Sequence, residues 1–113
     1  MATGFSNTGN QDYDAHAKTL KHFSTMASGV RSQGAAAMEL AYVAAGRIDG
    51  CYLFNLKSWD MAAGALIVRE AGGLVADTKG EDNWLASGNI VAATPRVFEP
   101  MIRSLKDLKV YEI

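Results

Sequence analysis

The stretch that decides the fold is residues 57–73, which read KSWDMAAGALIVREAGG. Its composition predicts a helix over residues 58–71, with Ser58 as the N-cap and the final glycine pair as the stop. One carboxylate, Asp60, lies in the first turn of this otherwise apolar helix. The helix dipole favours a negative charge at that end.

The segments around this helix predict an alternation of helices and strands. In the preceding strand, residues 49–56, Tyr52 and Phe54 share one face, while Cys51 and Leu53 share the other. The predicted fold class is therefore α/β, a layered sandwich of the α+β kind. The remaining expected elements are helices over residues 12–27, 35–45 and from Pro95 onward with Thr94 as cap, strands over 74–76 and 89–93, and a polar loop over 77–88.

Length and composition restrict the class of protein. The 113 residues suit one domain, residues 1–113, and 49% hydrophobic with 20% charged residues are typical of a folded chain. A formal net charge of -1 argues against a general nucleic-acid binder, and no apolar run is long enough to cross a membrane. The single cysteine, Cys51, cannot form an intramolecular disulfide, so a cytoplasmic location is expected.

Asp60 is the residue whose position suggests chemistry. A carboxylate at the edge of a packed layer suits a hard divalent cation, which prefers oxygen ligands. The competing interpretation is helix capping, because acidic residues are common in first turns for that reason alone. The two tryptophans, Trp59 and Trp84, are expected to pack, and Cys51 is expected to be a small core residue.

The stretch Trp59–Gly73 resembles the second signature of the inositol monophosphatase family, Trp-Asp-x-Ala-Ala-Gly-x-x-Ile-x-x-Glu-Ala-Gly-Gly. This long signature is specific, whereas shorter matches would be weak by themselves. The shorter matches nevertheless follow the family order along nearly the whole chain. They are residues 3–5, 29–37, 46–50 and 85–95.

The resemblance implies a Mg²⁺-dependent phosphomonoesterase with the C-terminal half of the inositol monophosphatase or fructose-bisphosphatase-like fold. The family uses the signature Asp as a metal ligand, which assigns the metal-binding and catalytic role to Asp60. The family's small-residue segment lines the substrate pocket, which assigns substrate binding to Gly34, Ala35 and Ala36 through backbone groups. Family members are usually homodimers that act on small phosphorylated substrates.

The chain departs from the family pattern in two respects. A complete member has an N-terminal half with a Glu and the motif Asp-Pro-(Ile/Leu)-Asp-Gly-Thr, and neither is present. The turn at Asp49 does not replace that motif, because Cys51 stands where its Thr belongs. Leu53 occupies the substrate-binding position at which inositol-specific members carry a Glu. Leucine accepts no hydrogen bond, so phosphates of histidinol, fructose or adenosine stay open as substrates besides inositol phosphate.

Two hypotheses about function follow. In the first, residues 1–113 are the C-terminal part of a phosphatase and are inactive alone, because one carboxylate cannot build a multi-metal site. In the second, they form a non-catalytic module that binds itself or a partner through apolar surface left by the absent half. The expected partners are a phosphorylated small molecule and a second copy or the missing half, not nucleic acid or membrane. An unrelated α/β domain with a chance signature is a third alternative.

Overall fold

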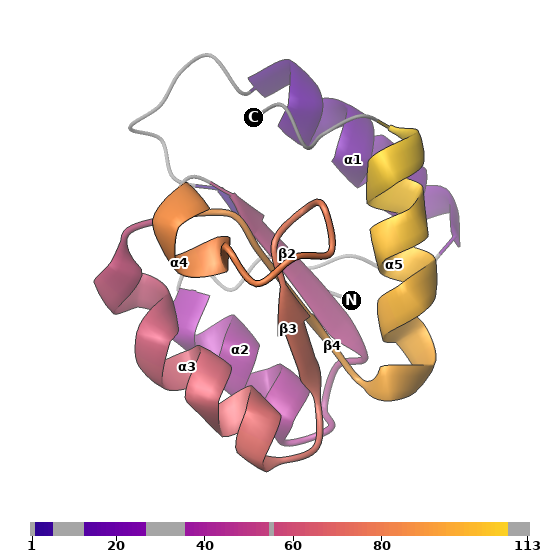
Figure 1. Cartoon of the computed structure of the whole chain (residues 1–113). Helices are drawn as coiled ribbons and strands as arrows, with labels where there is room; N and C mark the ends of the chain where they lie inside the picture. Colours follow the sequence, from indigo (N-terminus) through magenta and orange to yellow (C-terminus); the bar gives the residue numbers. More distant parts are fainter. Residues whose placement is uncertain (1, 6–12, 27–35, 55, 109–113) are drawn as a thin grey trace.

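Four strands form one mixed sheet that carries helices on both faces (Figure 1). The computed structural model describes residues 2–5, 13–26, 36–54 and 56–108. In chain order the elements are β1 (Ala2–Phe5), α1 (Tyr13–Met26), α2 (Ala36–Ala44), β2 (Gly50–Phe54), α3 (Ser58–Glu70), β3 (Leu74–Ala76), α4 (Trp84–Ser87), β4 (Ile90–Ala93) and α5 (Pro95–Asp107).

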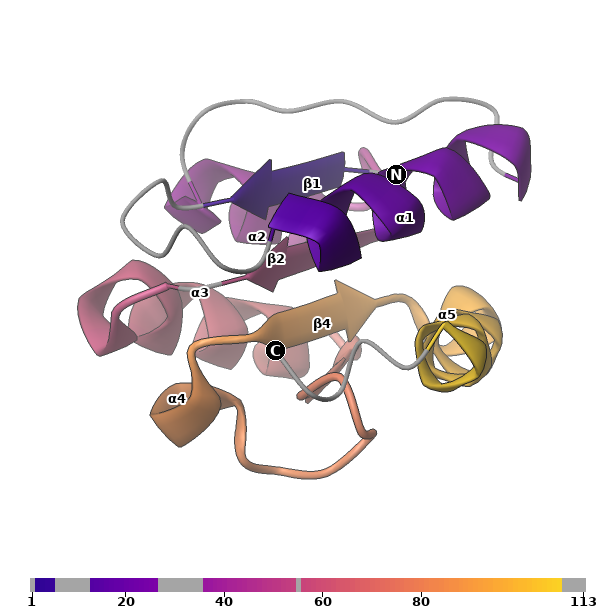
Figure 2. The same ribbon diagram turned by 90° about the horizontal axis from the view of Figure 1, so that it is seen from above.

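The sheet has the strand order β1-β2-β4-β3, and Figure 2 shows β1, β2 and β4 one after another across it. The edge strand β1 runs parallel to β2, whereas β4 is antiparallel to both β2 and β3. Tyr52 of β2 is paired with Val91 of β4, and Val75 of β3 with Ala92. The strand β2 is therefore hydrogen-bonded on both sides, which explains why every one of its residues is buried.

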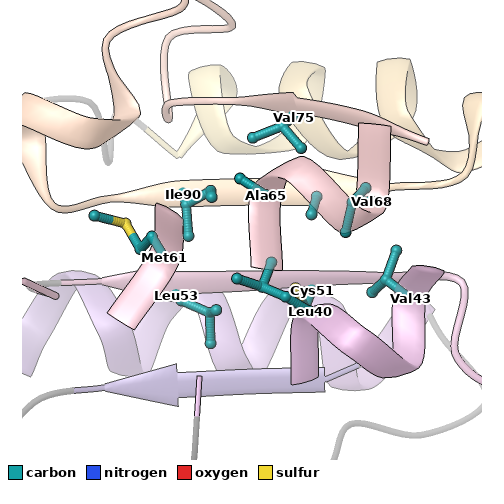
Figure 3. Close-up of a cluster of buried hydrophobic side chains, with 10 residues drawn as sticks. Leu40, Val43, Cys51, Leu53, Met61, Ala65, Val68, Val75 and Ile90 are labelled. Carbon is teal, nitrogen blue, oxygen red and sulfur yellow. The ribbon is translucent and has the colours of Figure 1, made fainter. Parts of the chain in front are cut away.

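Alternating side chains of the central strands supply two separate cores. Cys51 and Leu53 face α2 and α3, in the cluster drawn in Figure 3, whereas Tyr52 and Phe54 face α1 and α5. The prediction of two apolar faces on β2 is confirmed, and so is the layered α/β class. The first core also contains Leu40, Val43, Met61, Ala65, Val68, Val75, Ile90 and Ala92, and the second Phe23, Ala76, Val91, Ala93, Met101, Ile102 and Leu105.

The helices α2 and α3 lie side by side on their face of the sheet (Figure 1). Gly64 sits at their closest approach, where a Cβ atom would come within 2.7 Å of Leu40 Cδ1 and 2.8 Å of Leu40 Cβ. The absence of a side chain at Gly64 therefore allows the two helices to pack closely. None of the helices in the described part of the chain is long and apolar enough to span a membrane. The cytoplasmic location stays a prediction.

The structure corrects three expectations about local structure. The N-cap of α3 is Lys57, and Ser58 is the first helical residue, because the Asp60 carboxylate supplies the cap interaction. The predicted polar loop contains the short helix α4, which has too few residues for a recognisable apolar period. Trp59 does not pack against the described residues as expected, since 77% of it is exposed. The predicted helix start at Thr94 and Pro95 is confirmed.

Candidate functional site

Asp60 lies at the beginning of α3, the helix that follows β2 across a short connection. Its Oδ2 atom accepts the backbone N–H of Lys57 at 3.0 Å, and its own N–H donates to the Lys57 carbonyl at 2.9 Å. The first interaction is the carboxylate half of a capping box, which satisfies an otherwise free N–H group at the helix start. The competing capping interpretation is thus confirmed for one of the two carboxylate oxygens.

The second oxygen of Asp60, Oδ1, accepts no hydrogen bond from the described residues, and the side chain is partly exposed. A partly exposed carboxylate oxygen at a helix N-terminus fits one position in a Mg²⁺ coordination sphere. Within residues 2–5, 13–26, 36–54 and 56–108, however, no three His, Cys, Asp or Glu residues gather closely enough to hold a metal ion. This part of the chain therefore fits one ligand of a metal centre and does not form a complete centre.

The roles of the other predicted site residues stay predictions. Gly34 and Ala35 lie outside the described residues, and Ala36 is described only as the first residue of α2. Leu53 is fully buried in the core between β2 and α3, where Figure 3 shows it near Met61. Its side chain therefore reaches no solvent in this chain, and its role in substrate contact stays a prediction.

A second cluster joins α3 to the loop before α4. Asp82 accepts a hydrogen bond from Arg69 Nη2 at 2.7 Å and another from Trp84 Nε1 at 3.1 Å. The Arg69 guanidinium also lies over the Trp84 ring, 5.6 Å from its centroid. The hydrogen bond from Arg69, followed by that from Trp84, lowers the pKa of Asp82 below its ordinary value. Trp84 packs against the first core as expected, so the cluster fixes this loop against the helix.

Cys51 has no nucleophilic character in this fold. Its side chain is fully buried in the first core. Burial raises the pKa of the thiol well above its ordinary value, and the charge of the buried Glu39 raises it further. The thiolate needed for nucleophilic attack or metal binding is therefore strongly disfavoured, which agrees with the expected role as a small core residue.

The sequence did not reveal that apolar side chains on α2 and α3 would face outward, away from the sheet. The exposed fractions are 77% for Trp59, 60% for Leu66, 50% for Ile67 and 47% for Met38. We call the surface formed by these four residues the α2/α3 outer face. Exposed large apolar side chains on one pair of packed helices are typical of an interaction site. Trp59 neighbours Asp60, so this surface begins at the candidate metal ligand.

The fold defines the class of protein as a layered α/β protein with a carboxylate in the first turn of a helix that packs on the sheet. The profile of the inositol monophosphatase family matches residues 1–109. Since this match covers nearly the whole chain, the chain belongs to the inositol monophosphatase family, as the signature around Asp60 predicted.

Named relatives and solved structures agree with this assignment. A SuhB protein of Neisseria meningitidis is 50% identical over 103 residues, covering 91% of this chain and 40% of the relative. The Nus factor SuhB of Escherichia coli is 43% identical over 107 residues, covering 95% of this chain and 40% of the relative. The chain thus spans about two-fifths of the length of these relatives.

Solved structures of two further relatives share the fold. SuhB of Bartonella henselae has a TM-score of 0.87 at 42% identity, with 93% of this chain and 40% of that chain covered. The inositol monophosphatase of Anabaena (Nostoc) sp. PCC 7120 has a TM-score of 0.83 at 32% identity, with 94% of this chain and 42% of that chain covered. The predicted relation to part of the inositol monophosphatase fold is therefore confirmed.

Proposed function

We propose that this chain is the C-terminal part of a Mg²⁺-dependent phosphomonoesterase of the inositol monophosphatase type, to which Asp60 contributes one metal ligand. The observation that carries the proposal is the placement of the Asp60 carboxylate. One oxygen is held by the Lys57 N–H, and the other accepts no hydrogen bond from the described residues. The substrate class is an inositol phosphate or a related sugar or nucleotide phosphate.

The residues of this chain would orient the metal ligand and line one wall of the substrate site. The hydrogen bond from the Lys57 N–H fixes the Asp60 carboxylate at the positive end of α3. Bound Mg²⁺ would polarise the phosphoryl oxygens and activate water for attack on phosphorus. Gly34, Ala35 and Ala36 would contact the substrate through backbone groups.

The isolated chain is expected to be inactive, because its described residues supply one carboxylate ligand and its sequence lacks the main metal-binding motif. The α2/α3 outer face supports an association that completes the site. It is apolar and starts beside Asp60, so a polypeptide part covering Trp59 would bring its own groups to the carboxylate. We propose that this occupant corresponds to the remaining part of the relatives, of which this chain covers about 40%.

The test compares the chain with a chimera in which the remaining part of the Neisseria meningitidis relative precedes residue 1. Phosphate release is measured with Mg²⁺ and a panel of inositol, sugar and nucleotide phosphates. The chain alone should release none, the chimera should turn over, and Asp60→Asn should abolish that turnover. Asp49→Asn is the matched control, because Asp49 is an exposed bend residue outside the site. Undiminished turnover by the Asp60→Asn chimera would contradict the proposal.

A second candidate function is a non-catalytic module that self-associates or binds a protein partner. The exposed apolar side chains of the α2/α3 outer face favour it, as does the name Nus factor that several relatives carry. Under this proposal the same surface would be covered by a second copy or by another protein. Association that persists in the Asp60→Asn variant, without phosphate release by the chimera, would support it. The expectations that nucleic acid and membrane are not partners stay predictions.

A further inference from the structure

Gly88, which follows α4, lies against the segment that leads into α3. Its carbonyl oxygen accepts the backbone N–H of Leu56 at 2.8 Å. The next residue, Lys57, donates its N–H to Asp60 Oδ2 at 3.0 Å. Two successive backbone N–H groups thus connect a loop near the end of the chain with the carboxylate at the start of α3.

Resting on the metal-ligand role proposed for Asp60, we propose that Gly88 is a positioning residue for that carboxylate. It holds the Leu56 N–H in place, one residue before the Lys57 N–H, and the Lys57 N–H in turn orients Asp60 Oδ2. Gly88 itself reaches no metal or substrate in this role. Residues that orient ligands from outside the coordination sphere commonly affect metal affinity through such contacts.

Glycine is required at this position for two independent reasons. The backbone of Gly88 has φ +79°, a left-handed conformation that side chains disfavour. In addition, a Cβ atom would lie 2.6 Å from the Leu56 carbonyl oxygen and 3.3 Å from its nitrogen. Both neighbours are backbone atoms, which cannot rotate away. Any side chain at Gly88 would therefore push the Leu56 peptide and, with it, the Lys57 N–H.

The contacts of the loop around Gly88 hold this residue in place. It caps α4, and its N–H donates to the Trp84 carbonyl at 3.0 Å. Trp84 packs on the first core and donates to Asp82, which also binds Arg69 of α3. The loop that carries Gly88 is thus attached to α3 near the end of this helix and orients the Asp60 carboxylate near its start. A side chain at Gly88 cannot be accommodated by a shift of this loop without breaking those contacts.

Gly46 provides a matched control, because its backbone has φ +77° and a Cβ atom would meet nothing within 4 Å. Gly46 follows α2 and lies far from Asp60 in the sequence. Asparagine tolerates the left-handed conformation better than other side chains. Comparing Gly88→Asn with Gly46→Asn therefore separates crowding of Leu56 from backbone strain.

The test uses ¹⁵N NMR. The metal-free backbone contacts are read in the full chain, and Mg²⁺ binding is read in the chimera that is used to test the proposed function. In the wild type, the Leu56 amide should exchange slowly with solvent, and the Lys57 amide resonance should shift when Asp60→Ala removes its acceptor. Gly88→Asn should speed Leu56 exchange and shift the Lys57 resonance, and should lower the Mg²⁺ affinity read at residues 57–61 by about 10–100-fold. Gly46→Asn should change none of these.

The outcomes separate this inference from the function on which it rests. If Mg²⁺ moves no resonance of residues 57–61 in the wild-type chimera, the metal role of Asp60 is wrong, while the metal-free Lys57 shift in the chain alone still decides the role of Gly88. If Gly88→Asn leaves the Lys57 resonance and Leu56 exchange unchanged, the inference is overturned. Unprotected Leu56 exchange in the wild type overturns it too, whether or not Gly88→Asn folds.

Discussion

The helices α3 and α5 have the same length, 13 residues, and lie on opposite faces of the sheet, yet their outward surfaces differ in chemistry. The exposed positions of α5 include five charged residues: Arg96, Glu99, Arg103, Lys106 and Asp107. Those of α3 are apolar along most of its length, with exposed charges only at Arg69 and Glu70. The outward surface of α5 is therefore suited to water and that of α3 to protein contact.

This difference teaches that an amphipathic pattern identifies a helix with one surface in water. A helix that is apolar all round indicates only that protein covers both of its sides, and does not indicate which protein part covers the outer one. The inward surfaces of both helices are alike, because each places fully buried side chains against the sheet. The α2/α3 layer thus has a packed core on its inner side and exposed apolar side chains on its outer side. The candidate ligand Asp60 lies at the end of that layer, where an added part of the fold would meet it.

The largest expected effect tests whether the inward surfaces are equivalent. Met61→Ala in α3 and Leu105→Ala in α5 each remove a side chain that is fully buried in its core. Each should lower the free energy of unfolding by about 2–5 kcal/mol, because the lost burial is not replaced. Urea denaturation followed by circular dichroism measures both. A loss below about 0.5 kcal/mol for Met61→Ala alone would mean that the α3 side is not a packed core.

A smaller effect is expected on stability, and a clear one on association, when the outward surfaces are changed. Leu66→Glu on α3 should alter the free energy of unfolding by about 0.5 kcal/mol or less, because Leu66 is 60% exposed. It should weaken any association through the α2/α3 outer face by about tenfold or more, which equals about 1.4 kcal/mol. Sedimentation equilibrium measures self-association of the isolated chain. In the chimera, the protection of a thiol introduced by Ile67→Cys measures how far the α2/α3 outer face is covered.

The control for this prediction is Arg103→Glu on the charged surface of α5, which should leave association unchanged. Cys51 is buried and does not interfere with labelling of the introduced thiol. If Arg103→Glu weakens association as much as Leu66→Glu does, the contrast between the two helices does not determine where partners bind. Thiol protection that rises with the concentration of the isolated chain would identify a second copy as the occupant.

Much of the fold could be predicted because its signals are local. The alternation along residues 50–54 gave both faces of β2, and Thr94 with Pro95 marked the start of α5. The signature around Asp60 predicted both the family and the helix that carries this carboxylate. Periodicity and capping act over a few residues, so a single sequence displays them directly.

The parts that could not be predicted depend on contacts between distant segments. Nothing near Gly88 in the sequence indicates that its carbonyl would bind the Leu56 N–H. The residue type of Ser58 predicts an N-cap there, whereas the reach of the Asp60 carboxylate to the Lys57 N–H places the N-cap one residue earlier. The exposure of Trp59 cannot be predicted locally, because an apolar residue beside a helix start gives no sign of which part of a fold covers it.

The smallest expected effect concerns the exposed charges of the two helices, because those of α5 face water whereas Arg69 of α3 binds Asp82. The folded-state pKa of Asp82 lies below its ordinary value, so its pair with Arg69 contributes stability at neutral pH, and this contribution is lost as pH falls from about 4 through the lowered pKa. Thermal melting is measured from pH 7 to pH 3. The melting temperature of the wild type should therefore exceed that of Asp82→Asn at neutral pH, and the two melting temperatures should converge in acid. Glu99→Gln on α5, which removes a carboxylate that forms no ion pair with any described residue, should run parallel to the wild type throughout. A constant gap between the wild type and Asp82→Asn would show that the hydrogen bonds of Asp82, rather than its charge, hold the loop to α3.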